Sequence, residues 1–213
     1  MILSCLTALI ISCGPPVTFK DSQPTKVKGE TEFRKKFQGK YLSLIDSSLI
    51  YVTSDKIIVE LKGNYSIPKE DLDTLESMGL KYNPLYKKKK QEHLNVKNDT
   101  AFLNWANKDT IFKISPDNIL KYYNGMEVLN FKAGPNNWVV KKMEINRKGI
   151  LKISEITGPE EIQELKNITP VEEIKDENNK VMEYSINPSE KEFKKLLKNG
   201  AFLRAEIFQK IKE

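Results

Sequence analysis

Apolar and polar residues alternate with a period of two over much of the chain after residue 39. Ile57, Val59 and Leu61 alternate with Ile58, Glu60 and Lys62. This spacing predicts a half-buried strand, because successive side chains of a strand point to opposite faces. The run 49–53 is rich in β-branched and aromatic residues and predicts the preceding strand.

The clearest hairpin lies between residues 118 and 132. Asn124-Gly125 supplies the two positions with positive φ that a type I′ turn requires. The resulting register places Leu120 opposite Leu129. Further turn sequences separate strands expected at 110–114, 138–145 and 150–156. Five short antiparallel strands in this order would form a meander.

Helical patterns are fewer and shorter. We expect helices at 30–38 and 68–78, a third opened by Gly158-Pro159-Glu160, and a fourth that begins with the capping box of Ser189 and Glu192. The pattern as a whole predicts an α+β fold, a mainly antiparallel β-meander with three to four short helices. A strongly bent or barrel-like sheet is the more closed form of the same architecture.

Two segments of this part, 40–79 and 102–167, share a weak pattern. Three residues of the first segment recur in the second at an offset of 62 positions: Asp55, Ile57 and Gly63 as Asp117, Ile119 and Gly125. The pattern is consistent with an internal repeat, although ordinary strand and turn chemistry also produces such similarity. The length of 213 residues suits one β-rich globular domain over 31–213.

The first twelve residues differ in character from the rest. They carry no charge and are almost wholly apolar or small. A helix that spans a bilayer needs about 20 such residues, and Gly14-Pro15-Pro16 ends the run. Its length and the small residue before Cys13 predict a secretory signal peptide over residues 1–12.

Ile10-Ile11-Ser12-Cys13 resembles the lipobox of bacterial lipoproteins. The resemblance implies cleavage before Cys13, a diacylglycerol thioether on its sulfur and an acylated amine, hence a lipid anchor in a membrane. By resemblance to lipoprotein sorting, Gly14 indicates the outer membrane, with the domain facing the periplasm. The alternative is an apolar N-terminal strand or helix that buries a free cysteine.

The segment that follows is rich in Pro, Lys and small polar residues and lacks apolar periodicity. Residues 13–30 are therefore expected to comprise the lipidated cysteine and a flexible tether. Seventeen flexible residues would span about 23 Å.

Composition limits the chemistry of the folded part. Cys5 and Cys13 are the only cysteines and His93 is the only histidine, so we expect no disulfide framework, no metal site and no cofactor. The net charge is +6, with 35 basic residues interspersed among 29 acidic ones. This balance favours a mixed surface and indicates no specific nucleic acid partner.

Two sets of residues remain as candidate sites. The run Lys87, Lys88, Lys89 and Lys90 would suit an anionic polymer or lipid head groups, although adjacent lysines are also typical of a solvated loop. Thr74, Thr100 and Thr110 each follow an Asp and precede an apolar residue, which resembles bacterial periplasmic O-glycosylation sites. Unmodified threonines in caps or turns are the alternative.

Three functions are compatible with these features. The first is a membrane-anchored envelope lipoprotein with a non-enzymatic binding or structural role, whose partner is an envelope protein or an anionic polymer. The second is a periplasmic carrier that holds a small apolar ligand in a barrel-like pocket. The third is an envelope hydrolase that uses carboxylates, since paired acids can come from distant strands.

Overall fold

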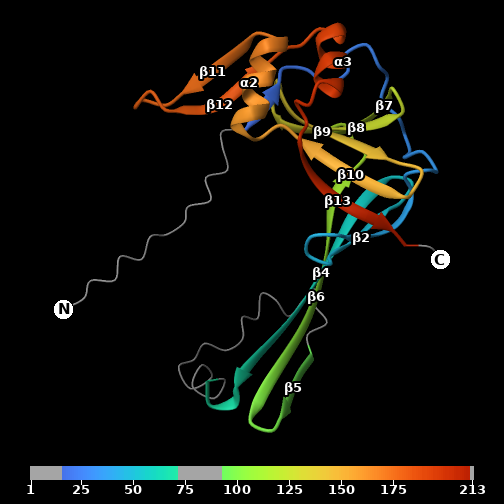
Figure 1. Ribbon diagram of the computed structural model, residues 1–213, viewed down its shortest axis with the longest axis vertical. Helices are drawn as coiled ribbons and strands as arrows, with labels where there is room; N and C mark the ends of the chain where they lie inside the picture. Colours follow the sequence, from blue (N-terminus) through green and yellow to red (C-terminus); the bar gives the residue numbers. More distant parts are fainter. Residues whose placement is uncertain (1–15, 72–92, 212–213) are drawn as a thin grey trace. The chain divides into compact units, whose positions relative to one another are not determined.

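The computed structural model describes residues 16–71 and 93–211, and strands are the main elements in both ranges (Figure 1). The chain is thus α+β and rich in strands, as its periodicity predicts. It divides into two compact units. Among the described residues, the first comprises 16–31, 115–145 and 152–206, and the second comprises 32–71, 93–114, 146–151 and 207–211.

The first unit contains a mixed sheet. Four of its strands are adjacent in the order β11 (Val171–Lys175), β12 (Val181–Ile186), β1 (Val17–Phe19) and β9 (Asn137–Ile145). The strand β1 runs parallel to β12 and antiparallel to β9. Also next to β9 lie β10 (Ile150–Glu155) and β8 (Met126–Gly134), and β8 pairs in turn with β7 (Asn118–Tyr123).

Two helices and the sheet form the core of this unit. In α2 (Pro159–Ile168), Ile162 and Leu165 are buried, and in α3 (Glu190–Lys198) Phe193, Leu196 and Leu197 are buried. These side chains pack with strand residues that include Val17, Phe19, Val128 and Ile186. Both helices were predicted from their N-terminal sequences and apolar spacing, and both predictions are confirmed.

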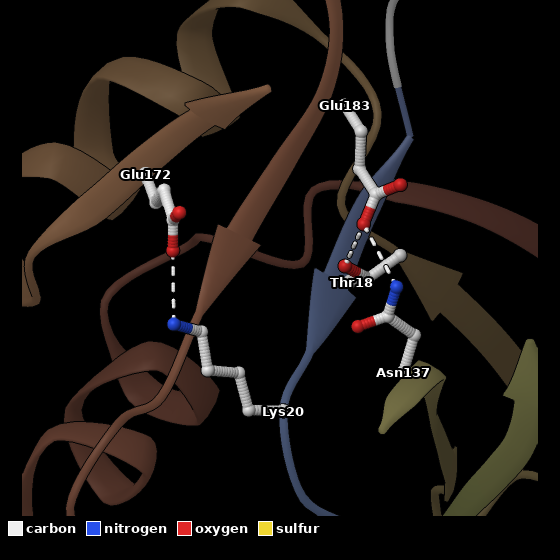
Figure 2. Close-up of polar contacts among 5 residues, drawn as sticks. All are labelled: Thr18, Lys20, Asn137, Glu172 and Glu183. Atoms are coloured by element: carbon white, nitrogen blue, oxygen red, sulfur yellow. Dashed lines mark hydrogen bonds and ion pairs between the residues drawn. The ribbon is translucent and has the colours of Figure 1, made fainter. Parts of the chain in front are cut away.

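The N-terminal strand β1 corrects the prediction of a flexible tether over residues 13–30, for the described residues 16–30. Phe19 is only 1% exposed and its ring meets that of Phe193 edge to face at 6.2 Å. Thr18 donates to Glu183 of β12, which also accepts from Asn137 at 3.4 Å, and Lys20 forms an ion pair of 2.9 Å with Glu172 (Figure 2). The prediction fails because three apolar or β-branched residues suffice for a strand that has partners on both sides.

Residues 21–30 also belong to the fold. The main chain of Gln23 exchanges hydrogen bonds with the Asn130 side chain, at 2.6 and 3.0 Å. Lys121 is 4% exposed, and its ammonium donates to carbonyl oxygens of Ser22 and Pro24 at 2.8 and 2.9 Å. Desolvation lowers the pKa of Lys121 to about 8. Buried polar groups of β7 and β8 thus hold this segment in place.

The second unit is built on an antiparallel sheet. Its strands are adjacent in the order β13, β2, β3, β4, β6 and β5, where β13 (Arg204–Lys210) contributes its C-terminal residues. The others are β2 (Gly39–Ser43), β3 (Leu49–Val52), β4 (Lys56–Pro68), β6 (Thr100–Lys113) and β5 (His93–Lys97). The strands β4 and β6 pair over their whole length, from Lys56 opposite Lys113 to Pro68 opposite Thr100.

The core of the second unit lies on one face of this sheet. Phe33 and Phe37 are fully buried there, although residues 30–38 form turns rather than the predicted helix. The ring of Phe33 meets that of Phe112 of β6 edge to face at 5.8 Å. The two phenylalanines are thus buried as their spacing suggests, in a segment that has no helical backbone. Of the helix predicted at 68–78, residues 69–71 are helical, and 72–78 lie outside the described residues.

Strand pairing confirms the predicted hairpin and corrects the detail of the meander. Leu120 lies opposite Leu129, and Asn124 and Gly125 have φ of +50° and +84°. However, β6 pairs with β4 and β5 rather than continuing into β7, and the parallel β1 makes the sheet mixed. In the described residues the strand orders end at β11, β7 and β5, so neither unit forms a closed barrel.

The offset of 62 residues does not relate equivalent structural positions at its two glycines. Gly63 lies within β4, opposite Trp105, whereas Gly125 forms the turn between β7 and β8. The similarity between the two segments at this point therefore reflects turn and strand composition.

Candidate anion-binding groove

A groove of about 600 Å³ opens on the second unit where three segments meet. Residues 38–40 lead into β2, residues 147–149 form the turn before β10, and residues 209–211 end β13. The antiparallel register of β13 and β2 places Lys210 opposite Tyr41. The start of β2 therefore lies beside the end of β13, which brings together residues about 170 positions apart in the sequence.

Backbone hydrogen bonds fix these three segments to one another. The N–H of Lys210 donates to the carbonyl of Gly149 at 2.9 Å, and the N–H of Ile211 donates to the carbonyl of Lys40 at 2.8 Å. In the turn before β10, the side chain of Asn146 accepts from the N–H groups of Lys148 and Ile150 at 2.9 and 3.0 Å. Main-chain and Asx-type bonds therefore define the wall of the groove.

Two glycines permit the close approach of the segments. Gly39 and Gly149 have φ of +139° and +78°, a region that side chains disfavour. A Cβ on Gly39 would also lie 2.7 Å from the Lys210 side chain. A Cβ on Gly149 would lie 3.2 Å from the Cβ of Lys210, so a larger residue at either position would crowd Lys210.

The groove is lined by cations and carries no acidic lining residue. Lys40, Arg147, Lys148 and Lys210 line it together with Gln38, Gln209, Ile211 and the two glycines. The ammonium of Lys210 donates to the carbonyl of Gln38 at 2.6 Å, and that of Lys40 lies 5.5 Å from the centre of the Tyr51 ring. Four like charges in a concave surface raise the local positive potential, which favours anions.

An ion-pair network on the same sheet surrounds the buried acid Glu60 and makes it unsuited to general-base chemistry. Glu60 is 6% exposed and accepts from the Tyr51 hydroxyl at 2.5 Å. Lys62 and Lys108 contact the two oxygens of its carboxylate at 3.0 and 3.4 Å. The hydrogen bond from Tyr51 is the main reason that the pKa of Glu60 is lowered to about 2, and the same bond raises the pKa of Tyr51 to about 12. A carboxylate with such a low pKa is a poor general base.

Of the site residues predicted from the sequence, Thr100 and Thr110 lie among the described residues, and neither lines this groove. Cys13, Thr74 and the run Lys87–Lys90 lie outside the described residues. Thr100 begins β6, and Thr110 is exposed further along the same strand. Ten residues of strand separate them by about 33 Å, so they form no common site, and their glycosylation stays a prediction.

Sequence reasoning identified one part of the groove but not its chemistry. Residues 147–149 fall in the turn expected between the strands at 138–145 and 150–156, and Arg and Lys are ordinary turn residues in isolation. Lys40 and Lys210 carry no local signal that links them to this turn. Only the pairing of β2 with β13 brings the charges together, and nothing in the local pattern predicts this pairing.

Two further features bear on membranes and metals. Among residues 16–71 and 93–211, no helix combines the length and the hydropathy that a bilayer span requires. The same residues contain no group of three or more His, Cys, Asp or Glu side chains placed to hold a metal ion.

Comparison of the chain with protein-family models, with curated proteins and with solved structures found no match.

Proposed function

We propose that this protein is a lipid-anchored protein of the bacterial outer membrane that faces the periplasm and binds an anionic envelope component without catalysing a reaction. The groove lined by Lys40, Arg147, Lys148 and Lys210 is the observation that carries the binding role. The resemblance of residues 10–13 to a lipobox supports the anchor.

The lining of the groove favours a ligand that bears phosphate or carboxylate groups. Arg147 can donate two parallel hydrogen bonds to such a group, and the lysines contribute point charges. A small apolar ligand, as in the carrier hypothesis, would gain little from this surface. For the hydrolase hypothesis, the most buried acid of the second sheet, Glu60, is already engaged by the Tyr51 hydroxyl and by Lys62 and Lys108.

The anchor is tested by the mass of the mature N-terminus in the native host. We expect the chain to begin at an acylated Cys13, and a Cys13→Ala variant to leave the membrane fraction or to remain a precursor. A chain with an unmodified cysteine at position 13 would contradict the anchor.

The groove is tested by titrating the detergent-solubilised full chain with inorganic tripolyphosphate at low salt. We expect the double variant Arg147→Gln, Lys148→Gln to bind about tenfold or more weakly, since one lost charge-assisted contact contributes about 1.5 kcal/mol or more. The matched control Lys191→Gln, Lys194→Gln removes the same charge from exposed positions on α3 and should bind as the parent does.

Equal losses in the two double variants would show that only net charge matters and would reject the groove. A third variant with Lys87–Lys90 changed to Gln distinguishes the lysine run from the groove. A loss confined to this third variant would assign the anionic partner to the run instead.

A further inference from the structure

The chain enters the fold only three residues after Cys13. The carbonyl of Pro16 accepts from the N–H of Tyr184 at 3.0 Å, and Val17, the first residue of β1, is 4% exposed. An extended chain covers at most about 3.6 Å per residue, so the Cα of Cys13 lies within about 11 Å of that of Pro16. The predicted tether of about 23 Å therefore has no counterpart between Cys13 and the core.

The strand that receives this short connection is held at both edges and on both faces. Val17 lies opposite Tyr184 in the parallel pair with β12, and Phe19 lies opposite Trp138 in the antiparallel pair with β9. The apolar side chains of β1 pack among α2, α3 and the sheet. Figure 2 shows Thr18 directed toward Glu183 of β12 and Lys20 directed toward Glu172 of β11, the strand beyond β12, and these contacts hold the other face.

The parallel pairing determines which end of the sheet lies next to Cys13. Because β1 and β12 run in the same direction, the start of β1 lies at the same end as the start of β12 and the turn 176–180 that precedes it. Ile174 and Met182 at this end are 41% and 50% exposed, large values for apolar side chains. We call Pro16 together with residues 174–182 the anchor-proximal end.

We propose that the anchor-proximal end of the first unit rests against the bilayer surface in the acylated protein. The inference rests on the proposed lipid anchor and adds to it the face of the protein that contacts the membrane. The short chain between Cys13 and Pro16 identifies the occupant as the bilayer, because no other surface is held so close. Ile174 and Met182 then meet the interfacial region of the lipid rather than water.

Single cysteines test this orientation. The sequence has no cysteine after Cys13, whose sulfur is blocked by the thioether, so an introduced cysteine is labelled alone. Asn178→Cys places a fluorophore in the turn of the anchor-proximal end. Asn187→Cys places it just beyond the other end of β12, about 20 Å away for six residues of strand. Both positions are exposed asparagines, and the backbone N–H of Asn178 keeps its bond to Asp176 in the variant.

The labelled, acylated proteins are reconstituted in phosphatidylcholine vesicles that contain a lipid with a quencher on its head group. We expect quenching at position 178 to exceed quenching at position 187 at least twofold. Inserting twelve Gly/Ser residues after Pro15 should remove most of this difference, because the added chain spans about 19 Å. Glu177→Cys in the same turn replaces Asn178→Cys if that variant fails to fold.

Equal quenching at the two positions, with an acylated Cys13 confirmed by mass, would overturn the orientation and leave the anchor intact. An unmodified Cys13 in the native host would overturn both. Quenching that persists at position 178 after the insertion would also count against the proposal, since the short connection would then not be its cause.

Discussion

Glu60 is a carboxylate that the sheet of the second unit buries only because donors surround it. The Tyr51 hydroxyl and the ammonium groups of Lys62 and Lys108 reach its two oxygens, and these contacts replace the water that the carboxylate loses. Its pKa is lowered to about 2 from 4.5, primarily by the hydrogen bond from Tyr51. The network thus stabilises the unit only while Glu60 is ionised.

We predict that Glu60→Gln lowers the free energy of unfolding by about 1 to 3 kcal/mol at pH 7. The folded pKa lies below the unfolded one, so the stabilisation is fully present above pH 4.5 and is lost as the pH falls toward 2. Urea denaturation at several pH values should show the two proteins converging over this window. Exposed Glu32, changed to Gln, is the control. A difference from the parent that stays constant down to pH 2 would contradict the role of ionisation.

At the scale of elements, β1 carries more of the stability of the fold than its three residues suggest. Phe19 is almost fully buried against α3, in the part of the chain that the sequence predicts to be a tether. Phe19→Ala should cost about 3 to 5 kcal/mol, since it removes a packed aromatic ring. The neighbouring Lys20→Ala removes only an exposed ion pair and should cost less than about 1 kcal/mol. Chemical denaturation of the solubilised full chain measures both losses. A Phe19→Ala variant as stable as the parent would contradict the packing role of β1 and support the predicted flexible tether.

The capping box of α3 permits a second prediction at this scale. Glu192 accepts from the N–H of Ser189 at 2.7 Å, and the Ser189 hydroxyl accepts from the N–H of Glu192 at 3.4 Å. Ser189→Ala should lower the stability by about 1 kcal/mol, whereas Ser189→Asp should preserve most of it, because Asp also caps helices well. Thermal unfolding followed by circular dichroism separates the two variants. A Ser189→Ala variant as stable as the parent would show that the cap contributes nothing at this position.

The elements predicted correctly from the sequence are those specified by nearby residues. The turn at Asn124-Gly125 and the helices α2 and α3 carry their own start and stop signals within a few positions. The strand β1 has no such signal, because Val17 finds its partner Tyr184 only 167 positions later. The groove was missed for the same reason, since Lys40 and Lys210 meet through a pairing between opposite ends of the chain.

At the scale of the whole molecule, the chain passes between the two units five times, at residues 31/32, 114/115, 145/146, 151/152 and 206/207. The strands β10 and β13 each contribute residues to both units. No single cut therefore separates the units into two continuous fragments, and we expect their unfolding to be coupled.

One tryptophan in each unit tests this coupling. Trp105 belongs to the second unit and Trp138 to the first. Trp105→Phe and Trp138→Phe each leave one reporter, and in each variant the fluorescence midpoint in urea should coincide with the midpoint of circular dichroism. Using each variant's own dichroism as reference removes any effect of the substitution on stability. Fluorescence that changes before the dichroism in one variant would show that the units unfold separately.

The position of β1 also sets an order of events during biosynthesis. This strand leaves the ribosome before the rest of the fold, yet the residue opposite Val17 is Tyr184, and the partner on the other side, Trp138, also follows late. A signal peptide at residues 1–12 would deliver the chain in the same order across a membrane. The first strand to arrive therefore cannot complete its pairing until residue 186 has followed, and we expect β1 to join the sheet late in folding.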